Sequence, residues 1–314
     1  MIIAVWLPLL MPLLAVPLAR RGAEQLPPRT AAWALTALAL VLALSSTAAL
    51  VLLALNGALR LPFVAALGHL SPHLLGDGSP ATVPAAVLAA CALTALGASV
   101  LRRAVRHVRE LRAAHRHFGS EASAGDLSVR EDERPDAYAL PGRPGRIVVT
   151  TGMLRALSAR EREVLFAHER AHLSGRHHLF LVATEFAVAL HPALRGLRAP
   201  LSYALERWAD ESAARVTGDR ALTARAVGRA ALAARAASPR PRLSLTATAG
   251  PVPRRVSALL SAPKPAARAL PRALAGLLLV CVALSATAAL EAATDLHDGI
   301  EVAQGESAPV GHGD

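Results

Sequence analysis

Four stretches of the chain contain no charged residue, and they constrain the fold more than any other feature. These stretches are residues 1–19, 31–55, 81–101 and 273–290. A helix needs about 20 apolar residues to cross a lipid bilayer. The sequence therefore predicts four transmembrane helices, although Pro8, Pro12 and Pro17 weaken the first of them. No basic segment precedes the first stretch, so we interpret it as a span and not as a signal peptide.

The composition agrees with a membrane protein that carries one modest polar domain. Hydrophobic residues make up 53% of the chain and charged residues 18%, whereas soluble domains carry about 25% charged residues. This excludes a disordered chain and a disulfide-stapled miniprotein. The net charge is +11, but aromatic residues are only 3%, too few for a base-stacking surface, so we expect no nucleic-acid partner. Cys91 and Cys281 lie inside apolar stretches, and we interpret them as small hydrophobic residues that face lipid or pack between helices.

The distribution of basic residues predicts an orientation for the four spans. Arginines gather between the first two stretches and after the third, and three basic residues precede the fourth. Residues 56–80 hold one base, and residues 291–314 hold six acids and no base. We therefore expect a multi-pass protein of the plasma membrane with both termini outside. The predicted domains are a membrane domain (1–101), a cytoplasmic domain with its linker (102–272), the fourth helix (273–290) and an extracytoplasmic acidic tail (291–314).

Residues 168–172 read His-Glu-Arg-Ala-His, the H-E-x-x-H pattern of zinc peptidases. Positions i and i+4 share one face of an α-helix, so His168 and His172 can bind one Zn²⁺ through neutral imidazole nitrogens. Glu169 lies on the adjacent flank, where it can act as the general base toward the attacking water. The pattern therefore predicts a catalytic metal site on a helix.

The residues around this pattern predict where the helix begins and ends. Ser158 and Glu161 have the spacing of a capping box. Residues 159–173 contain neither glycine nor proline, and Gly175 supplies a stop. The histidine pair should therefore lie in the middle of one helix.

Other segments of the polar domain carry weaker patterns. Residues 138–140 and 147–150 are predicted to be short strands that flank a turn, and the second could be internal to a sheet or could pair with an extended substrate. Residues 179–190 are apolar but too short to span a bilayer, which indicates a core helix or a segment resting on the membrane. The proline- and arginine-rich residues 251–265 are interpreted as a linker back to the membrane.

Two residues compete to be the third metal ligand. His178 completes the H-E-x-x-H-x-x-G-x-x-H pattern, but that class also needs a methionine turn downstream, and every methionine lies upstream. Glu206 lies on a separate predicted helix, residues 201–216, which Gly218 ends. Asp210 follows one turn later on the same face, where it can accept the free N–H of a ligating imidazole. The sequence favours Glu206 with Asp210 as its companion, and it places His177 and His178 at a rim near the membrane surface.

Four segments of the polar domain resemble the membrane-embedded gluzincin peptidases. They are residues 137–142, 146–154, 168–172 and 206–211. The nearest resemblance is to the antibiotic-sensor-transducer metallopeptidases of the BlaR/MecR type, followed by the heat-shock and CAAX-prenyl proteases. The resemblance implies a zincin-like α+β domain and zinc endopeptidase activity, with His168, His172 and Glu206 as ligands and Glu169 as base. Only 24 residues follow the fourth span, so a penicillin-binding domain is not expected there.

The sequence as a whole predicts a mainly α protein: four transmembrane helices and a cytoplasmic α+β domain with a small sheet. We expect an integral-membrane zinc endopeptidase with one Zn²⁺ per chain that hydrolyses polypeptides at the cytoplasmic membrane face. Tyr203, Arg215 and Arg220 are candidates by residue type for stabilising the oxyanion. The rival hypothesis is a non-catalytic membrane sensor whose zinc site is structural or vestigial.

Overall fold

The computed structural model describes residues 2–61, 63, 82–118, 123–235 and 252–261, together with isolated positions from 276 to 298. Its secondary structure is mainly helical, with one small sheet. The predicted fourth span, 273–290, and the acidic tail, 291–314, lie outside the described residues apart from such isolated positions.

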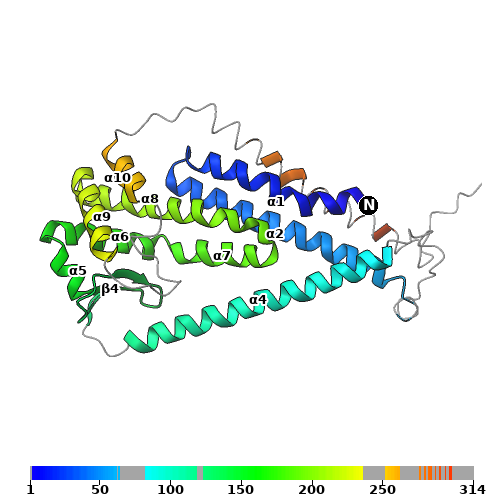
Figure 1. Ribbon diagram of the computed structural model, residues 1–314, viewed down its shortest axis with the longest axis horizontal. Helices are drawn as coiled ribbons and strands as arrows, with labels where there is room; N and C mark the ends of the chain where they lie inside the picture. Colours follow the sequence, from blue (N-terminus) through cyan, green and yellow to red (C-terminus); the bar gives the residue numbers. More distant parts are fainter. Residues whose placement is uncertain are drawn as a thin grey trace, which may run out of the picture.

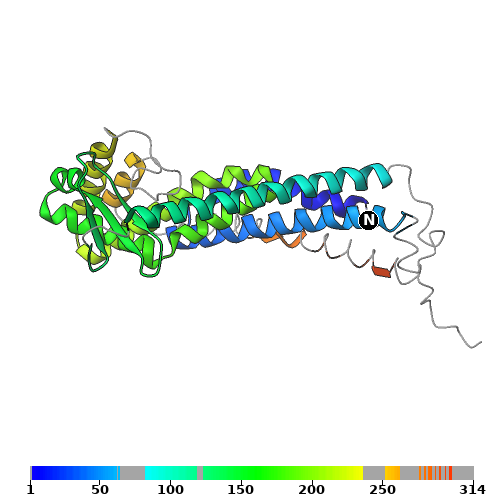
Figure 2. The same ribbon diagram turned by 90° about the horizontal axis from the view of Figure 1, so that it is seen from below.

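A rod of long helices carries a compact lobe at one end (Figures 1 and 2). The rod contains α1 (Ile2–Ala23), α2 (Pro28–Ala58), α4 (Thr82–Phe118) and α7 (His177–Leu190). Helices α1 and α2 form a hairpin, and α2 also packs against α4 and α7. The apolar residues 179–190 thus belong to a helix within the bundle, where α7 packs between α2 and α4.

Helix α1 contains three internal prolines, and neighbouring elements offer polar groups to two of its backbone carbonyls. Pro12 has no N–H, so the carbonyl of Pro8 loses its usual partner. The hydroxyl of Ser46 on α2 lies 2.7 Å from that carbonyl oxygen and can donate to it. Nε2 of His191 lies 3.1 Å from the carbonyl oxygen of Leu9. The carbonyl that Pro12 leaves without a helical partner is therefore matched by a hydroxyl of α2.

Two helices in the described part of the chain are long and apolar enough to cross a membrane. They are Pro28–Ala58, in α2, and Thr82–Ala113, in α4. The prediction of four spans is corrected to two for the described residues. Helix α1 is not among the two, and its inner face, with Ala15 and Ala19, packs into the core that also holds residues of α2 and of the 3₁₀ helix η2 (Pro192–Leu197). Part of its apolar character is therefore explained by protein packing.

The lobe is built on a four-stranded sheet of order β1-β2-β4-β3. The strands are β1 (Ser123–Ala124), β2 (Leu127–Arg130), β3 (Ala137–Leu140) and β4 (Arg146–Thr150). Strand β4 pairs in parallel with β2 and antiparallel with β3. The two predicted strands are confirmed. Because β4 is paired on both sides, it is internal, and β3 forms the edge of the sheet.

Helices cover the sheet and build the rest of the lobe. They are α5 (Thr151–Ala156), α6 (Ala159–Ser174), the 3₁₀ helix η2 (Pro192–Leu197), α8 (Arg198–Thr217), α9 (Arg220–Arg235) and α10 (Val252–Leu260). Helix α6 contacts β3, β4, α8 and α9, so it lies at the centre of the lobe. The interpretation of residues 251–265 as a linker is wrong in part, because α10 packs on α8 and α9 there. That packing buries Arg255 and Leu259, which a solvated linker would expose.

Candidate metal centre

The His-Glu-Arg-Ala-His pattern lies on one helix, α6, as the sequence predicts, but in its second half and not at its middle. The capping box is present: the backbone N–H of Ser158 donates to Glu161 Oε2 at 2.9 Å. Gly175 occupies the C-cap. Between these ends the helix buries His168, Glu169 and His172.

Helix α8 brings Glu206 to the two histidines. Nε2 of His168 lies 3.1 Å from Nε2 of His172, and each of these nitrogens lies 3.6 Å from an oxygen of Glu206. The three residues are buried, and their potential ligand atoms all lie within 4.8 Å of one another. Two imidazoles and one carboxylate are a donor set that catalytic zinc commonly takes. The residues present therefore fit a metal ion.

Asp210 lies behind this donor group, one helical turn after Glu206. Its Oδ1 lies 3.1 Å from Nδ1 of His168, on the side of the ring that faces away from the donor group. Arg255 from α10 is fully buried and bridges the two carboxylates. Its Nη1 lies 2.7 Å from Glu206 Oε2, and its Nε and Nη2 lie 2.8 and 2.6 Å from the oxygens of Asp210. Sequence reasoning missed Arg255, whose neighbours Pro251, Pro253 and Arg254 have the composition of a linker.

His177 and His178 do not form the rim pair that the sequence predicts. His177 is fully buried, because the turn after α6 folds it back toward the centre, and its Nδ1 lies 2.8 Å from Nδ1 of His172. His178 is partly buried and is not a member of the donor group found among the described residues. The alternative third ligand is therefore not placed with the other two, whereas Glu206 is.

The charges around the donor group favour a cation. Burial lowers the pKa of His168, but the hydrogen bonds and charges of Asp210 and Glu206 outweigh it and raise that pKa to about 10. Burial alone would raise the pKa of Glu206, yet the charge of Arg255 keeps it below its usual range. Two ionised carboxylates and one guanidinium leave a net negative charge behind the imidazoles. A metal ion would be stabilised by the same field.

Glu169 is placed beside the donor group and is fully buried. Burial raises the pKa of its carboxyl group to about 7, and the charges of Glu206 and Asp136 act in the same direction. The charge of His168 and the backbone of Ala139 on strand β3 oppose this rise. A carboxyl group that titrates near neutral pH can both accept and return a proton.

Two of the three candidates for the oxyanion have other partners. Arg220 binds Glu211 and donates to the carbonyls of Ala258 and Leu259 at the end of α10. The guanidinium of Arg254 lies over the ring of Tyr203, 5.0 Å from its centroid. The third candidate, Arg215, is exposed and bonds within α8. No hydrogen bond or ion pair joins any of the three to the donor group in the described residues.

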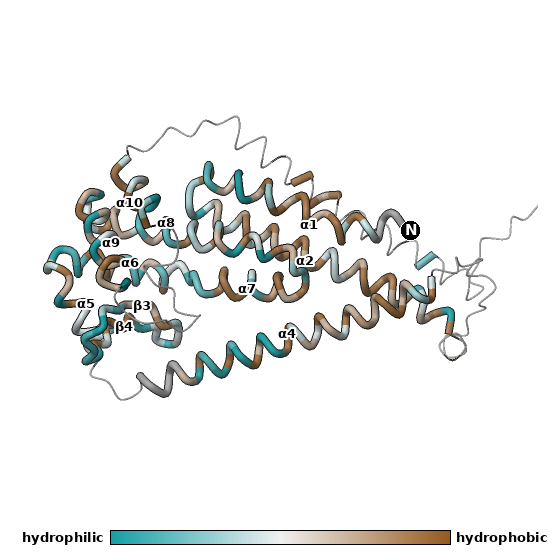
Figure 3. Tube along the Cα trace, viewed as in Figure 1, coloured by the Kyte–Doolittle hydropathy of each residue, from teal (hydrophilic) through white to brown (hydrophobic). Residues whose placement is uncertain are grey.

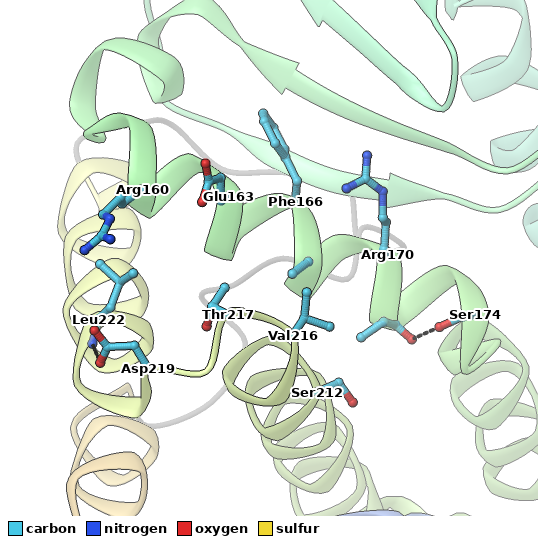
Figure 4. A pocket seen from close by; sticks show the side chains of 12 residues that line it. Arg160, Glu163, Phe166, Arg170, Ser174, Ser212, Val216, Thr217, Asp219 and Leu222 are labelled. Carbon is cyan, nitrogen blue, oxygen red and sulfur yellow. Dashed lines mark hydrogen bonds between the residues drawn. The ribbon is translucent and has the colours of Figure 1, made fainter.

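A pocket of about 670 Å³ opens between α6, the end of α8 and the start of α9 (Figure 4). Its α6 lining includes Arg160, Glu163 and Arg170. Together with Ala167, which also lines the pocket, these residues recur at three- and four-residue steps along a face of α6 that contains neither His168 nor His172. The pocket is therefore separate from the metal centre.

The donor set and the helix that carries it are those of a metallopeptidase. The family model described as peptidase family M48 matches residues 101–263, more than half of the chain. The chain belongs to peptidase family M48, and it is thus a protease of a family that typically depends on a metal ion. No curated protein and no solved structure matches the chain.

Proposed function

We propose that this protein is a zinc-dependent endopeptidase held in the cell membrane, with its peptidase lobe on the cytoplasmic side. The observation that carries the proposal is the buried donor group of His168, His172 and Glu206 with Glu169 beside it. His168, His172 and Glu206 would hold the metal, and Asp210 would orient His168. Zinc bound there supplies Lewis-acid polarisation of the scissile carbonyl and lowers the pKa of a nearby water.

The residues of the chain perform the proton transfers. The Glu169 carboxylate accepts the proton of the attacking water and returns it to the nitrogen of the leaving amine. Its raised pKa suits both steps, since the group gains and loses a proton near neutral pH. Oδ1 of Asp210 lies 3.1 Å from Nδ1 of His168, where it would accept the proton of that nitrogen and so keep the Nε2 lone pair of the ring directed at the donor group.

The edge strand β3 offers a place for the substrate backbone. It packs against α6 and is paired only with β4 among the described residues. The pKa of Glu169 is affected by the backbone of Ala139 on this strand, so β3 borders the catalytic carboxylate. An extended polypeptide that adds to the sheet at β3 would pass beside Glu169. A substrate that binds to β3 through its main chain needs no free amino or carboxyl terminus at the site. This mode of binding therefore supports cleavage within a polypeptide, which is endopeptidase activity.

The apolar half of α4 supports a membrane location. Only 11% of its most apolar window is buried inside the protein, and Val83, Val87, Leu88 and Leu101 are exposed there. Figure 3 shows this apolar half at the end of the rod far from the lobe, and polar residues along the half near the lobe. Arg102, Arg106 and Arg109 follow on the same helix and are exposed. By the positive-inside rule this end, and with it the lobe, faces the cytoplasm.

The substrates would be polypeptides near the inner membrane surface. Regulatory cleavage of a repressor or a membrane protein is the form of this activity that the resemblance to sensor-transducers implies.

The test is cleavage of an unfolded protein by the detergent-purified chain, with and without a zinc chelator. We expect chelator-sensitive cleavage that falls by about 10²–10⁴ in Glu169→Gln, which loses the base, while that variant still binds one zinc. Glu163→Gln is the matched control, because Glu163 is exposed on another face of the same helix. Zinc binding without cleavage by the wild-type chain would instead favour the non-catalytic sensor, and an active Glu169→Gln variant would overturn the mechanism.

A further inference from the structure

His172 and His177 form a buried pair that the proposed catalytic mechanism does not use. Their Nδ1 atoms lie 2.8 Å apart, and their rings are nearly perpendicular, at 87°. A contact of that length between two imidazole nitrogens needs one proton between them, because two lone pairs or two N–H groups would repel each other. The pair therefore restricts which tautomers the two rings adopt.

The geometry of the donor group decides which ring is the donor. Nε2 of His172 faces the donor group, 3.1 Å from Nε2 of His168 and 3.6 Å from Oε1 of Glu206. A nitrogen that binds a metal must be unprotonated, so a neutral His172 carries its proton on Nδ1. That N–H points at His177, whose Nδ1 must be the acceptor.

We propose that His177 is the positioning residue for His172. By accepting the Nδ1–H of His172, it fixes the tautomer and the ring angle that direct Nε2 at the metal. Asp210 performs the same task for His168, so each ligand histidine has its own acceptor on a different element. This inference rests on the proposed metal centre.

The fold holds His177 in place from three sides. Arg176, with φ of 50°, adopts the left-handed conformation that is uncommon for a residue with a side chain, and it forms the turn between α6 and α7. The ring of Trp208 on α8 lies against His177, with centroids 4.6 Å apart. A Cβ at Gly175 would lie 2.5 Å from Nε2 of His177, so the glycine leaves room for the ring. Because these contacts restrict the ring of His177, that ring can in turn restrict the orientation of His172.

This packing also connects the metal centre to helix α2. Trp208 contacts Phe180 of α7, and Phe180 contacts Trp33 of α2. The guanidinium of Arg29, in the first turn of α2, lies 5.4 Å from the centroid of the Trp208 ring. The first turns of α2 thus contact Trp208 and Phe180, these rings contact His177, and His177 contacts His172, a proposed ligand of the metal.

The test compares the zinc affinities of the full chain in detergent, measured by competition with a chromogenic chelator. His177→Phe keeps a ring against Trp208 but has no acceptor, and we expect it to bind zinc about 10–100-fold more weakly. His177→Asn places an amide oxygen near the position of Nδ1, and we expect it to restore most of the affinity. His178→Asn is the matched control and should bind zinc as the wild type does. The absorption spectrum of the Co²⁺-loaded protein should change in His177→Phe and return toward wild type in His177→Asn.

Two results would overturn the inference. One is wild-type zinc affinity in His177→Phe. The other is equal loss in His177→Phe and His177→Asn, which would make His177 a packing residue. If His177→Phe does not fold, as judged by metal-free melting, His177→Met replaces it as the variant without an acceptor. A wild-type chain that binds no zinc would overturn the proposed metal centre itself. This result is seen with the wild-type chain alone, so it cannot be confused with a failure of the role proposed for His177, which only the variants reveal.

Discussion

Arg255 and Glu206 form a fully buried ion pair, with Nη1 2.7 Å from Oε2. The same guanidinium binds Asp210 through two nitrogens. One arginine therefore holds both Glu206, the proposed third ligand, and Asp210, the carboxylate proposed to orient His168. Removing one partner of a buried charge pair is costly, because the charge that remains has neither water nor a counterion.

We expect Arg255→Met to lower the free energy of unfolding by about 3–5 kcal/mol, because it leaves Glu206 and Asp210 buried without compensation. The loss should be largest without metal, since bound zinc replaces part of the missing positive charge. Thermal melting of the metal-free and zinc-loaded variant measures both effects.

Arg254→Met is the matched control for this substitution. Arg254 precedes Arg255 on α10, but it is exposed and pairs with Glu24. Surface pairs of this kind contribute about 0–1 kcal/mol. Equal destabilisation by the two substitutions would contradict the role we give to Arg255.

Removal of the metal should lower the melting temperature of the wild-type chain. A ligand present at 100 times its Kd stabilises the folded state by about 2.7 kcal/mol. Glu206→Gln replaces the anionic ligand with a neutral one, so we expect zinc to raise the melting temperature of this variant much less. Melting with excess zinc and with excess chelator measures the difference, and Glu163→Gln should behave as the wild type. An equal zinc effect in Glu206→Gln would remove Glu206 from the ligand set.

The Glu211–Arg220 pair should make stability depend on pH. Burial alone would raise the pKa of Glu211, but the hydrogen bonds and charges of Arg220 and Arg207 lower it below its ordinary value of 4.5. A lowered pKa in the folded state stabilises the protein above the unfolded-state pKa, and this contribution is lost as the pH falls through the folded-state value. We therefore expect Arg220→Gln to melt below the wild type at neutral pH, by roughly 2–4 °C, with the gap closing as the pH drops below about 4.

Arg215→Gln serves as the control for the pH dependence, because Arg215 is exposed and bonds only within α8. Melting curves recorded from neutral to acidic pH should show its gap from the wild type unchanged. A gap for Arg220→Gln that widened on acidification would reverse the sign we assign to Glu211.

Gly57 allows α2 and α4 to approach each other closely. A Cβ at this position would lie 2.1 Å from Cβ of Ala86. We expect Gly57→Ala to separate the helices at a cost of about 1–3 kcal/mol. Gly97→Ala on α4 is the control, since its added Cβ would meet nothing within 4 Å. Comparison of their melting temperatures in detergent checks the contact, and a stable Gly57→Ala protein would argue against it.

The local features of the lobe could be predicted from the sequence because they depend on neighbouring residues. The capping box of Ser158 and Glu161 and the stop at Gly175 gave the ends of α6 correctly. Gly218, with φ of 69°, ends α8 as expected. Strand β4 was also recognisable from its β-branched residues, whereas β1 and β2 were not predicted. The ligand roles of His168, His172 and Glu206 stay predictions, although the structure places the three side chains together.

The residues that sequence reasoning missed depend on contacts between distant segments. Arginine is rarely buried, and nothing near Arg255 in the sequence indicates the two carboxylates on α8 that compensate it. His177 was placed at a rim because it adjoins His178, yet the left-handed Arg176 turns one ring inward. Apolar length alone overstated the membrane spans among the described residues, since a helix such as α1 also supplies protein core.

Helix α10 follows α6 and α8 in the chain, so the residues of the candidate metal centre are synthesised in a fixed order. A ribosome completes α6 and α8 before it reaches Arg255. Until α10 has emerged, the carboxylates of Glu206 and Asp210 lack the guanidinium that compensates their charge in the folded lobe. The nascent chain therefore reaches the charge balance of its metal centre only near the end of the lobe's synthesis.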